Sequence, residues 1–284
     1  MTPTVMPDRT ARVVLTIDRL ALDVARHWLA YVNLLLGIFV IAAFLAPAFM
    51  AVGATGPADA IYFIYGILCH QLPERSFFLF GPKTSYSYAE IGRVYPYDSF
   101  FTLRVFIGNV AMGWKVAWSD RMVSLYGSFW IGGLVYALLR RRLPPLSPVA
   151  WLFLAILPMG VDGLSHMVND AVAGISGTGF RDTNAWLQVL TGNLLPATFY
   201  AGDALGSFNN LARLVTGTLT GLTSVWLVYP IVDKAMKDMA QSAQLQLASL
   251  RAAQLGSANR PVNAVPSAPP DQPSPVTSGP MTTE

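Results

Sequence analysis

Two short polar stretches hold the residue types in this chain that could carry chemistry. Asp162 and His166 are four residues apart, a spacing that places both on one face of a helix. Such a pair can serve as a general base, bind a metal ion, or form a structural hydrogen bond. Cys69 and His70 are adjacent and form the second stretch. The predicted catalytic residues are therefore Asp162, His166, Cys69 and His70, and the predicted ligands of a divalent metal are His70, Asp162 and His166. A buried, inert Cys69 and a purely structural Asp162–His166 pair are the alternatives.

Arginines near these stretches could hold an anionic substrate. Arg75, Arg121 and Arg181, together with Asn184, are the predicted anion-binding residues. Each arginine also has an acidic residue beside it in the sequence. Ion pairing with that neighbour, or contact with lipid phosphates, is therefore the alternative role.

The composition indicates that lipid surrounds much of this protein. Of its 284 residues, 53% are hydrophobic and only 12% are charged, whereas soluble domains carry about 25% charged residues. The net charge of +3 comes without a basic patch interleaved with aromatic residues, which argues against a nucleic-acid partner. The single cysteine excludes an intrachain disulfide.

Four apolar segments are long enough to cross a bilayer, which takes about 20 residues. They run over residues 29–52, 121–140, 147–163 and 213–232. Segment 100–118 is a fifth candidate that ranks below these four because it carries Arg104, Asn109 and Lys115. Segment 59–69 is too short to span and is predicted to be a partly immersed helix. The predicted fold is an all-α integral membrane protein.

Basic residues predict the orientation of these spans. They precede the first span, form the triplet 140–142 between the second and third, and follow the last span as Lys234 and Lys237. Four spans place all three groups on one face, which the positive-inside rule makes cytoplasmic. We therefore predict a multi-pass protein of the cytoplasmic membrane with both termini in the cytoplasm and its polar stretches on the outer face.

The two ends of the chain have their own character. Residues 1–28 contain an amphipathic helix with an arginine-rich face, suited either to an anionic membrane surface or to docking on a partner subunit. Beyond the transmembrane domain, 29–232, residues 233–256 are predicted to form a cytoplasmic helix that Gly256 ends. Residues 257–284 are rich in proline and small residues and predict a disordered tail.

Small residues give the last span a face for close helix packing. Thr216, Gly217, Thr220 and Gly221 recur on one side of it. A weak repeat of 25 residues also relates Asn184, followed by Thr191-Gly192, to Asn209, followed by Thr216-Gly217.

The stretch Cys69-His70-Gln71-x-Pro73-x-Arg75-Ser76-Phe77, with Gly81 after it, resembles the opening motif of the bacterial membrane proteins grouped as domain of unknown function 2085. Further resemblances to that family lie at 119–126, where its motif is C-x-R-C-x-G-x-Y, and at 162–166, 181–184 and 213–221. The resemblance implies an inner-membrane architecture and a set of residues, without a reaction. Two departures stand out: Ser119 and Met122 replace the two cysteines, and an insertion at 82–117 separates the first two motifs.

Two functional hypotheses follow. The favoured one is a non-catalytic subunit or scaffold of a membrane complex, whose partners are the lipid bilayer and other membrane subunits. The missing cysteines favour it. The alternative is a membrane-embedded enzyme, metal-dependent or not, that acts on a lipid headgroup or another anionic substrate at the outer leaflet.

Overall fold

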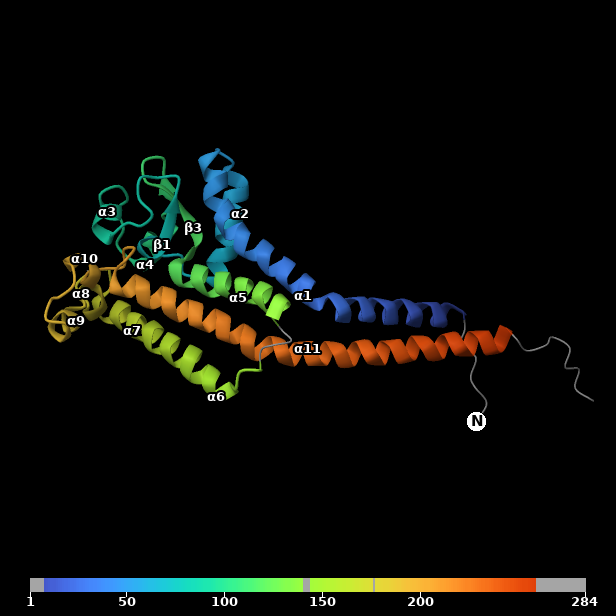
Figure 1. The fold of residues 1–284 in the computed structure, drawn as a ribbon. Helices are drawn as coiled ribbons and strands as arrows, with labels where there is room; N and C mark the ends of the chain where they lie inside the picture. The colour runs from blue at the N-terminus through green and yellow to red at the C-terminus, as the bar shows by residue number, and fades with distance from the viewer. Residues whose placement is uncertain (1–7, 140–143, 176, 259–284) are drawn as a thin grey trace, which may run out of the picture.

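Four long helices form the body of the protein in this computed structural model, which describes residues 8–139, 144–175 and 177–258. They are α1 (Asp8–Ala51), α5 (Asp120–Leu139), the continuous helix made of α6 (Pro148–Trp151), η2 (Leu152–Ile156) and α7 (Leu157–Ala173), and α11 (Phe208–Ala258) (Figure 1). Each is long and apolar enough to cross a membrane. The four predicted spans are therefore confirmed. The basic triplet 140–142, which follows the second span, lies outside the described residues.

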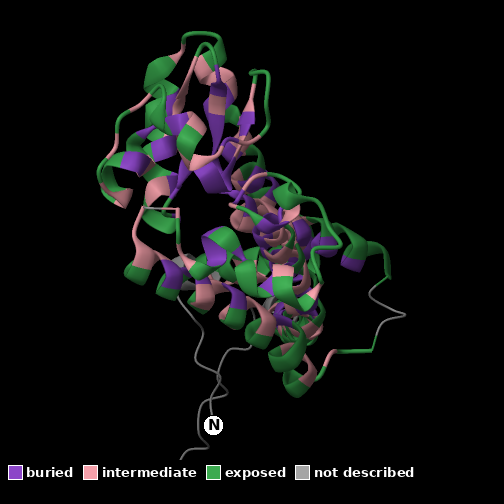
Figure 2. Ribbon diagram, turned by 90° about the vertical axis from the view of Figure 1, so that its left-hand side faces the viewer, coloured by how far each residue is buried: buried purple, intermediate pink, exposed green. Residues whose placement is uncertain are grey.

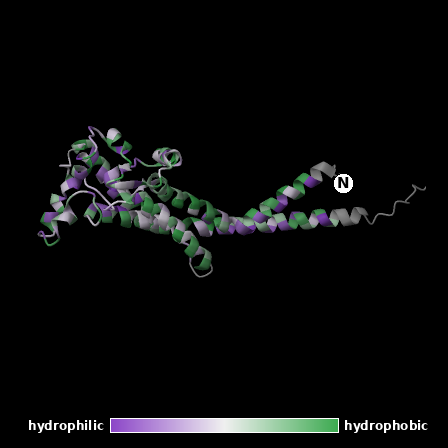
Figure 3. Ribbon diagram, turned by 90° about the horizontal axis from the view of Figure 1, so that it is seen from above, coloured by the Kyte–Doolittle hydropathy of each residue, from purple (hydrophilic) through white to green (hydrophobic). Residues whose placement is uncertain are grey.

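Large apolar side chains on these helices point away from the protein. Leu34, Leu35 and Ile38 of α1 are 58–67% exposed, and hydrophobic residues follow the bundle in Figure 3. A water-soluble protein avoids contiguous apolar surface of this extent. The exposed surface therefore suits the hydrocarbon region of a bilayer.

Two of the helices are much longer than a bilayer requires. α1 has 44 residues and α11 has 51, which at 1.5 Å per residue makes them about 65 and 75 Å long against a hydrocarbon core of about 30 Å. Beyond the bundle they run in opposite directions, and the ring centroids of Trp28 and Tyr229, where this projection begins, are 5.3 Å apart (Figure 1). We call this projection, residues 8–28 and 233–258, the two-helix arm. Seen from above, the N-terminal end of α1 diverges from α11 (Figure 3).

The arm corrects two sequence-based boundaries. The amphipathic helix predicted within residues 1–28 is not a separate element, because α1 runs without a break from Asp8 into the first span. Residues 233–256 are helical, but they are the last part of α11, which continues through Gly256 to Ala258. A glycine inside a helix costs only about 1 kcal/mol, so it marks a possible end without enforcing one. Residues 259–284, most of the predicted disordered tail, lie outside the described residues.

A small antiparallel sheet makes the all-α prediction incomplete. Its strands are β1 (Ser76–Leu79), β2 (Gly108–Asn109) and β3 (Gly113–Ser119), in the order β1–β3–β2. The short helices α3 (Tyr88–Gly92) and α4 (Phe100–Val105) lie between β1 and β2. We call residues 69–119 the cap. The predicted insertion 82–117 therefore supplies most of the sheet, and segment 100–118 forms a short helix and strands instead of a span.

Aromatic side chains anchor the cap to the first span. α2 (Thr55–Leu68) follows α1 and packs against it and β3. The Tyr65 hydroxyl donates to the carbonyl of Phe39 in α1, and the ring of Trp118 in β3 lies 4.9 Å from that of Phe39. Buried residues continue from the cap into the helices beneath it (Figure 2). The cap is thus packed on the bundle.

Helices α5 and α11 approach each other closely at two glycines of α11. A Cβ on Gly217 would lie 2.1 Å from the hydroxyl of Ser124, and one on Gly221 would lie 2.0 Å from that of Ser128. These distances leave no room for a side chain. The predicted small-residue face of the last span is therefore confirmed as a helix-packing surface.

The third span is irregular just before Pro158. Pro158 has no N–H for the carbonyl of Leu154, and residues Leu152–Ile156 form a π-helical turn just before it. Such turns accommodate a break in the hydrogen-bond ladder. Beyond α7, three short helices lead to α11: α8 (Phe180–Thr183), α9 (Ala185–Leu190) and α10 (Ala197–Tyr200).

Candidate functional site

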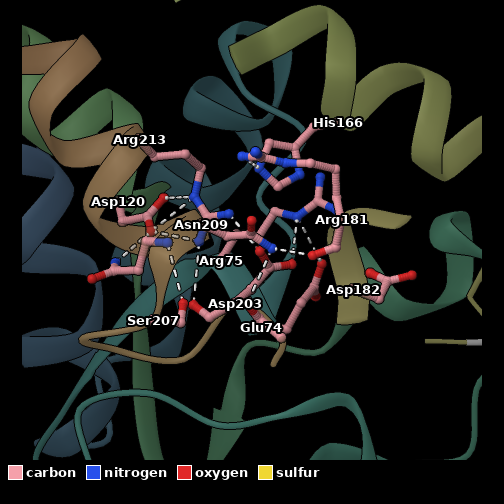
Figure 4. A network of polar contacts seen from close by, with 12 residues as sticks. Glu74, Arg75, Asp120, His166, Arg181, Asp182, Asp203, Ser207, Asn209 and Arg213 are labelled. Atoms are coloured by element: carbon pink, nitrogen blue, oxygen red, sulfur yellow. Dashed lines mark hydrogen bonds and ion pairs between the residues drawn. The ribbon is translucent and has the colours of Figure 1, made fainter. Parts of the chain in front are cut away.

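Charged residues from the cap, three spans and the α8–α11 connection meet at one end of the bundle (Figure 4). We call this group the polar cluster; it consists of Arg75, Asp120, Arg121, Asp162, Asp170, Arg181, Asp203 and Arg213. The predicted anion-binding arginines 75, 121 and 181 are all members. Polar stretches that are separate in the sequence therefore meet at one end of the bundle.

Asp203 joins the cap to the last span. One of its carboxylate oxygens lies 2.6 Å from Nη1 of Arg213, and the other lies 3.1 Å from Nε of Arg75. Burial alone would raise the pKa of Asp203, but the charges of Arg213 and Arg75 outweigh it and hold that pKa below its usual range. Asp203 is therefore an anion that bridges two buried cations.

Asp120 supports the same arginine from the second span. It accepts from Nε and Nη2 of Arg213 at 2.8 Å each, and Asn210 donates to it at 2.7 Å. Asp120 and Arg213 are 1% and 2% exposed. The first turn of α5 is thereby fixed against the first turns of α11.

Arg75 holds the third span. Its two terminal nitrogens donate to the two oxygens of Asp170 at 2.8 and 2.7 Å, a bidentate pair. Glu74 lies beside it, with 3.5 Å between Nε of Arg75 and Oε1 of Glu74. Burial raises the pKa of Glu74 to about 7, although Arg75 opposes part of this effect. Glu74 is thus an acid whose charge changes near neutral pH.

Asp162 bridges two arginines. It accepts from Nη2 of Arg121 at 2.8 Å and from Nη2 of Arg181 at 2.6 Å. His166 lies one turn further along α7, with Nε2 3.0 Å from the same nitrogen of Arg181 and 3.8 Å from Asp162. Among the described residues, Nδ1 of His166 and the Nε atoms of Arg121 and Arg181 are buried without a hydrogen-bond partner. This bridge carries one negative charge between two positive ones.

A cavity of about 290 Å³ opens beside this bridge. His70, Ser119, Arg121 and His166 line it, together with Arg75 and Arg213. Desolvation by the surrounding protein, and then the positive charges of Arg75 and Arg121, lower the pKa of His70, although its side chain keeps an exposed face. His70 is therefore neutral at physiological pH, and because its Nδ1 accepts from the backbone N–H of Leu72 at 3.3 Å, its Nε2–H is the group that can donate to a bound molecule.

The structure shows the positions that the two cysteines of the C-x-R-C-x-G-x-Y motif would occupy. Sγ of Cys69 is 3.5 Å from Oγ of Ser119, and Met122 lines the same cavity as His70. Cys69 itself is buried. Replacement by Ser119 and Met122 thus removes two thiols from the vicinity of Cys69 and His70.

The predicted metal ligands do not form a metal site. Within residues 8–139, 144–175 and 177–258, no three His, Cys, Asp or Glu side chains are placed to hold an ion. The physical reason is that both oxygens of Asp162 bind arginines, and Nε2 of His166 faces the guanidinium of Arg181. The Asp162–His166 spacing was interpreted correctly as one helix face, but that face meets cations.

Asn184 is a structural residue in this arrangement. Its side-chain nitrogen donates to the carbonyls of Arg181 and Tyr200 at 2.8 and 2.6 Å, and it lies 3.3 Å from Oδ1 of Asn209. The two asparagines of the 25-residue repeat therefore meet, both fully buried. Asn184 does not line the cavity beside the Asp162 bridge.

Lys115, which is completely buried in β3, is not among the site residues predicted from the sequence. Its ammonium donates to the carbonyls of Gln71 and Arg104 at 2.7 and 2.6 Å. Burial lowers its pKa to about 7. Nothing in its local sequence distinguishes it from a surface lysine; only the fold of the cap buries it.

By its structure this chain belongs to the class of multi-pass helical membrane proteins, and it carries a polar cluster at one end of its helix bundle. Over residues 108–227 the chain matches the family described as "Predicted membrane protein (DUF2085)". The resemblance noted from the sequence is thus confirmed there, whereas the opening motif at 69–77 precedes the matched residues. An uncharacterised protein of Methanocaldococcus jannaschii is 25% identical over 200 residues, which cover 68% of this chain and 85% of that protein. No solved structure matches.

Proposed function

We propose that this protein is a non-catalytic subunit or scaffold of a complex in the cytoplasmic membrane, with both termini in the cytoplasm. The observation that carries this proposal is the pairing within the polar cluster. Each of its four arginines and four aspartates contacts an opposite charge within the cluster. A catalytic acid or base has to exchange protons with a substrate, and these aspartates are held by arginines instead.

The two-helix arm supports a docking role. Val13, Ile17, Leu20 and Val24 recur at spacings of four and three, so they form one stripe along α1. They are 38–64% exposed, and the N-terminal end of α1, which carries them, diverges from α11 (Figure 3). If the arm projects into the cytoplasm, an apolar stripe on it offers a surface for a helix of a partner subunit.

The test is extraction in a mild detergent followed by measurement of the mass of the particle. We expect a co-purifying protein in stoichiometric amount, and its loss when Ile17→Ser is combined with Leu20→Ser. The control pair is Val52→Ser with Val110→Ser, which removes exposed apolar side chains away from the arm. A lone monomer, or equal loss in both variants, would contradict the docking proposal.

The alternative, an enzyme acting on a headgroup, is favoured by one observation. The cavity of about 290 Å³ brings together two histidines, His70 and His166, with the hydroxyl of Ser119 and the guanidinium of Arg121. A panel of phospholipids in nanodiscs tests it. Headgroup turnover that disappears in His70→Ala would replace the scaffold proposal with the enzymatic one.

A further inference from the structure

A second cavity lies on the other side of the Asp162 bridge. Its volume is about 480 Å³, within the roughly 300–1,000 Å³ range of small-molecule sites. Most of its wall is apolar, formed by Leu157, Pro158, Val161, Phe180, Trp186, Phe208 and Ala212. It therefore lies between the third and fourth spans, beside the short helices α8 and α9.

The polar end of this cavity carries a cation. Asp162, Ser165 and Arg181 complete the wall. Arg181 is 5% exposed and lies over the ring of Phe208, 5.1 Å from its centroid. Its Nε has no hydrogen-bond partner among the described residues. A buried guanidinium nitrogen without a partner is costly, and an anionic oxygen would satisfy it.

The charges around Asp162 also favour an anion. This one carboxylate serves two guanidiniums, those of Arg121 and Arg181, which leaves a local excess of one positive charge. The opposite excess lies at the other end of the cluster, where Asp120, Asp170 and Asp203 face Arg75 and Arg213. The cation that borders the apolar cavity therefore belongs to the positive side.

The apolar end of the cavity is open to lipid. Leu157 and Val161 are 51% and 63% exposed on a helix apolar enough to span the membrane, and Trp186 is 46% exposed. Tryptophan is common at the level where hydrocarbon meets headgroups. A chain from the bilayer can therefore enter from the side without crossing a polar barrier.

We propose that this cavity binds one anionic phospholipid, with an acyl chain between α7 and α11 and the phosphate on Arg181. The match is of two kinds: an apolar cleft open to hydrocarbon, and a cation at its end with an unused donor. Arginine suits phosphate because its planar donors match the phosphate oxygens. This site is independent of the docking role of the arm.

Native mass spectrometry of the full-length protein, freed of lipid and supplied with phosphatidylglycerol or phosphatidylcholine, tests the proposal. We expect one phosphatidylglycerol molecule per chain, bound at least about tenfold more tightly than phosphatidylcholine, a difference of about 1.4 kcal/mol. Ala212→Phe fills the cavity from α11 and should abolish this binding. Val215→Phe adds the same side chain to a lipid-facing position on that helix and should leave it unchanged.

Further measurements distinguish lipid binding from binding of a free anion and from a folding defect. Inorganic phosphate alone should neither bind stably nor displace the lipid. Val161→Trp fills the cavity from α7, so it replaces Ala212→Phe if that variant does not fold. Equal binding of the two lipids, unchanged binding in the filled variant, or displacement by millimolar phosphate would each overturn the proposal.

Discussion

Neutralising Asp203 should destabilise the fold strongly, because this residue bridges the cap and the last span. In Asp203→Asn, the ion pairs at 2.6 Å to Arg213 and 3.1 Å to Arg75 lose their negative partner. The side chain is buried, so two buried guanidiniums are left with one charge fewer to compensate them. Removing one partner of a buried ion pair costs about 3–5 kcal/mol. Two hydrogen bonds to charged groups, each worth roughly 1.5–3 kcal/mol, give about the same total.

Thermal unfolding in detergent, followed by tryptophan fluorescence, measures this loss. About 4 kcal/mol should lower Tm by roughly 8–16 °C for a protein of this size. The matched control is Asp59→Asn, the same change at an exposed position of α2, which should leave Tm within about 2 °C, since surface changes cost about 0.5 kcal/mol or less. A Tm for Asp203→Asn equal to that of the control would refute the idea that the cluster clasps the cap to the bundle.

Two further predictions concern charge and packing. Since burial raises the pKa of Glu74 to about 7 from an ordinary 4.5, its charged form destabilises the fold, and stability should be lost as pH rises from about 5 to 8. The shift of about 2.5 units corresponds to about 3 kcal/mol. Glu74→Gln should flatten this slope relative to the unchanged protein in parallel denaturant titrations, and two identical slopes would argue against a neutral Glu74. Gly221→Leu should cost at least about 2 kcal/mol by overpacking, because its Cβ would lie 2.0 Å from Oγ of Ser128. Gly160→Leu, at a helical glycine with no atom within 4 Å of the added Cβ, is the control, and equal Tm values would show that α5 and α11 can separate freely.

Local patterns in the sequence predicted most of the helix bundle. Apolar runs predicted the four spans, and the small residues at 216–221 predicted the packing face, because both depend on residues close together in the chain. The sheet was missed for the opposite reason. β1 and β3 pair across more than thirty residues, and the pairing of Phe78 with Lys115 has no local signature.

The candidate site divides in the same way. The sequence alone determined which residues are polar within an apolar chain, and it placed Asp162 and His166 on one helix face. It could not determine what that face meets, since the answer comes from Arg121 in another helix and Arg181 beyond the end of α7. Ligand spacing suggests a metal only while the opposing side chains are unknown. The tertiary structure decided that they are guanidiniums, and an aspartate bound by two guanidiniums holds the fold together instead of holding an ion.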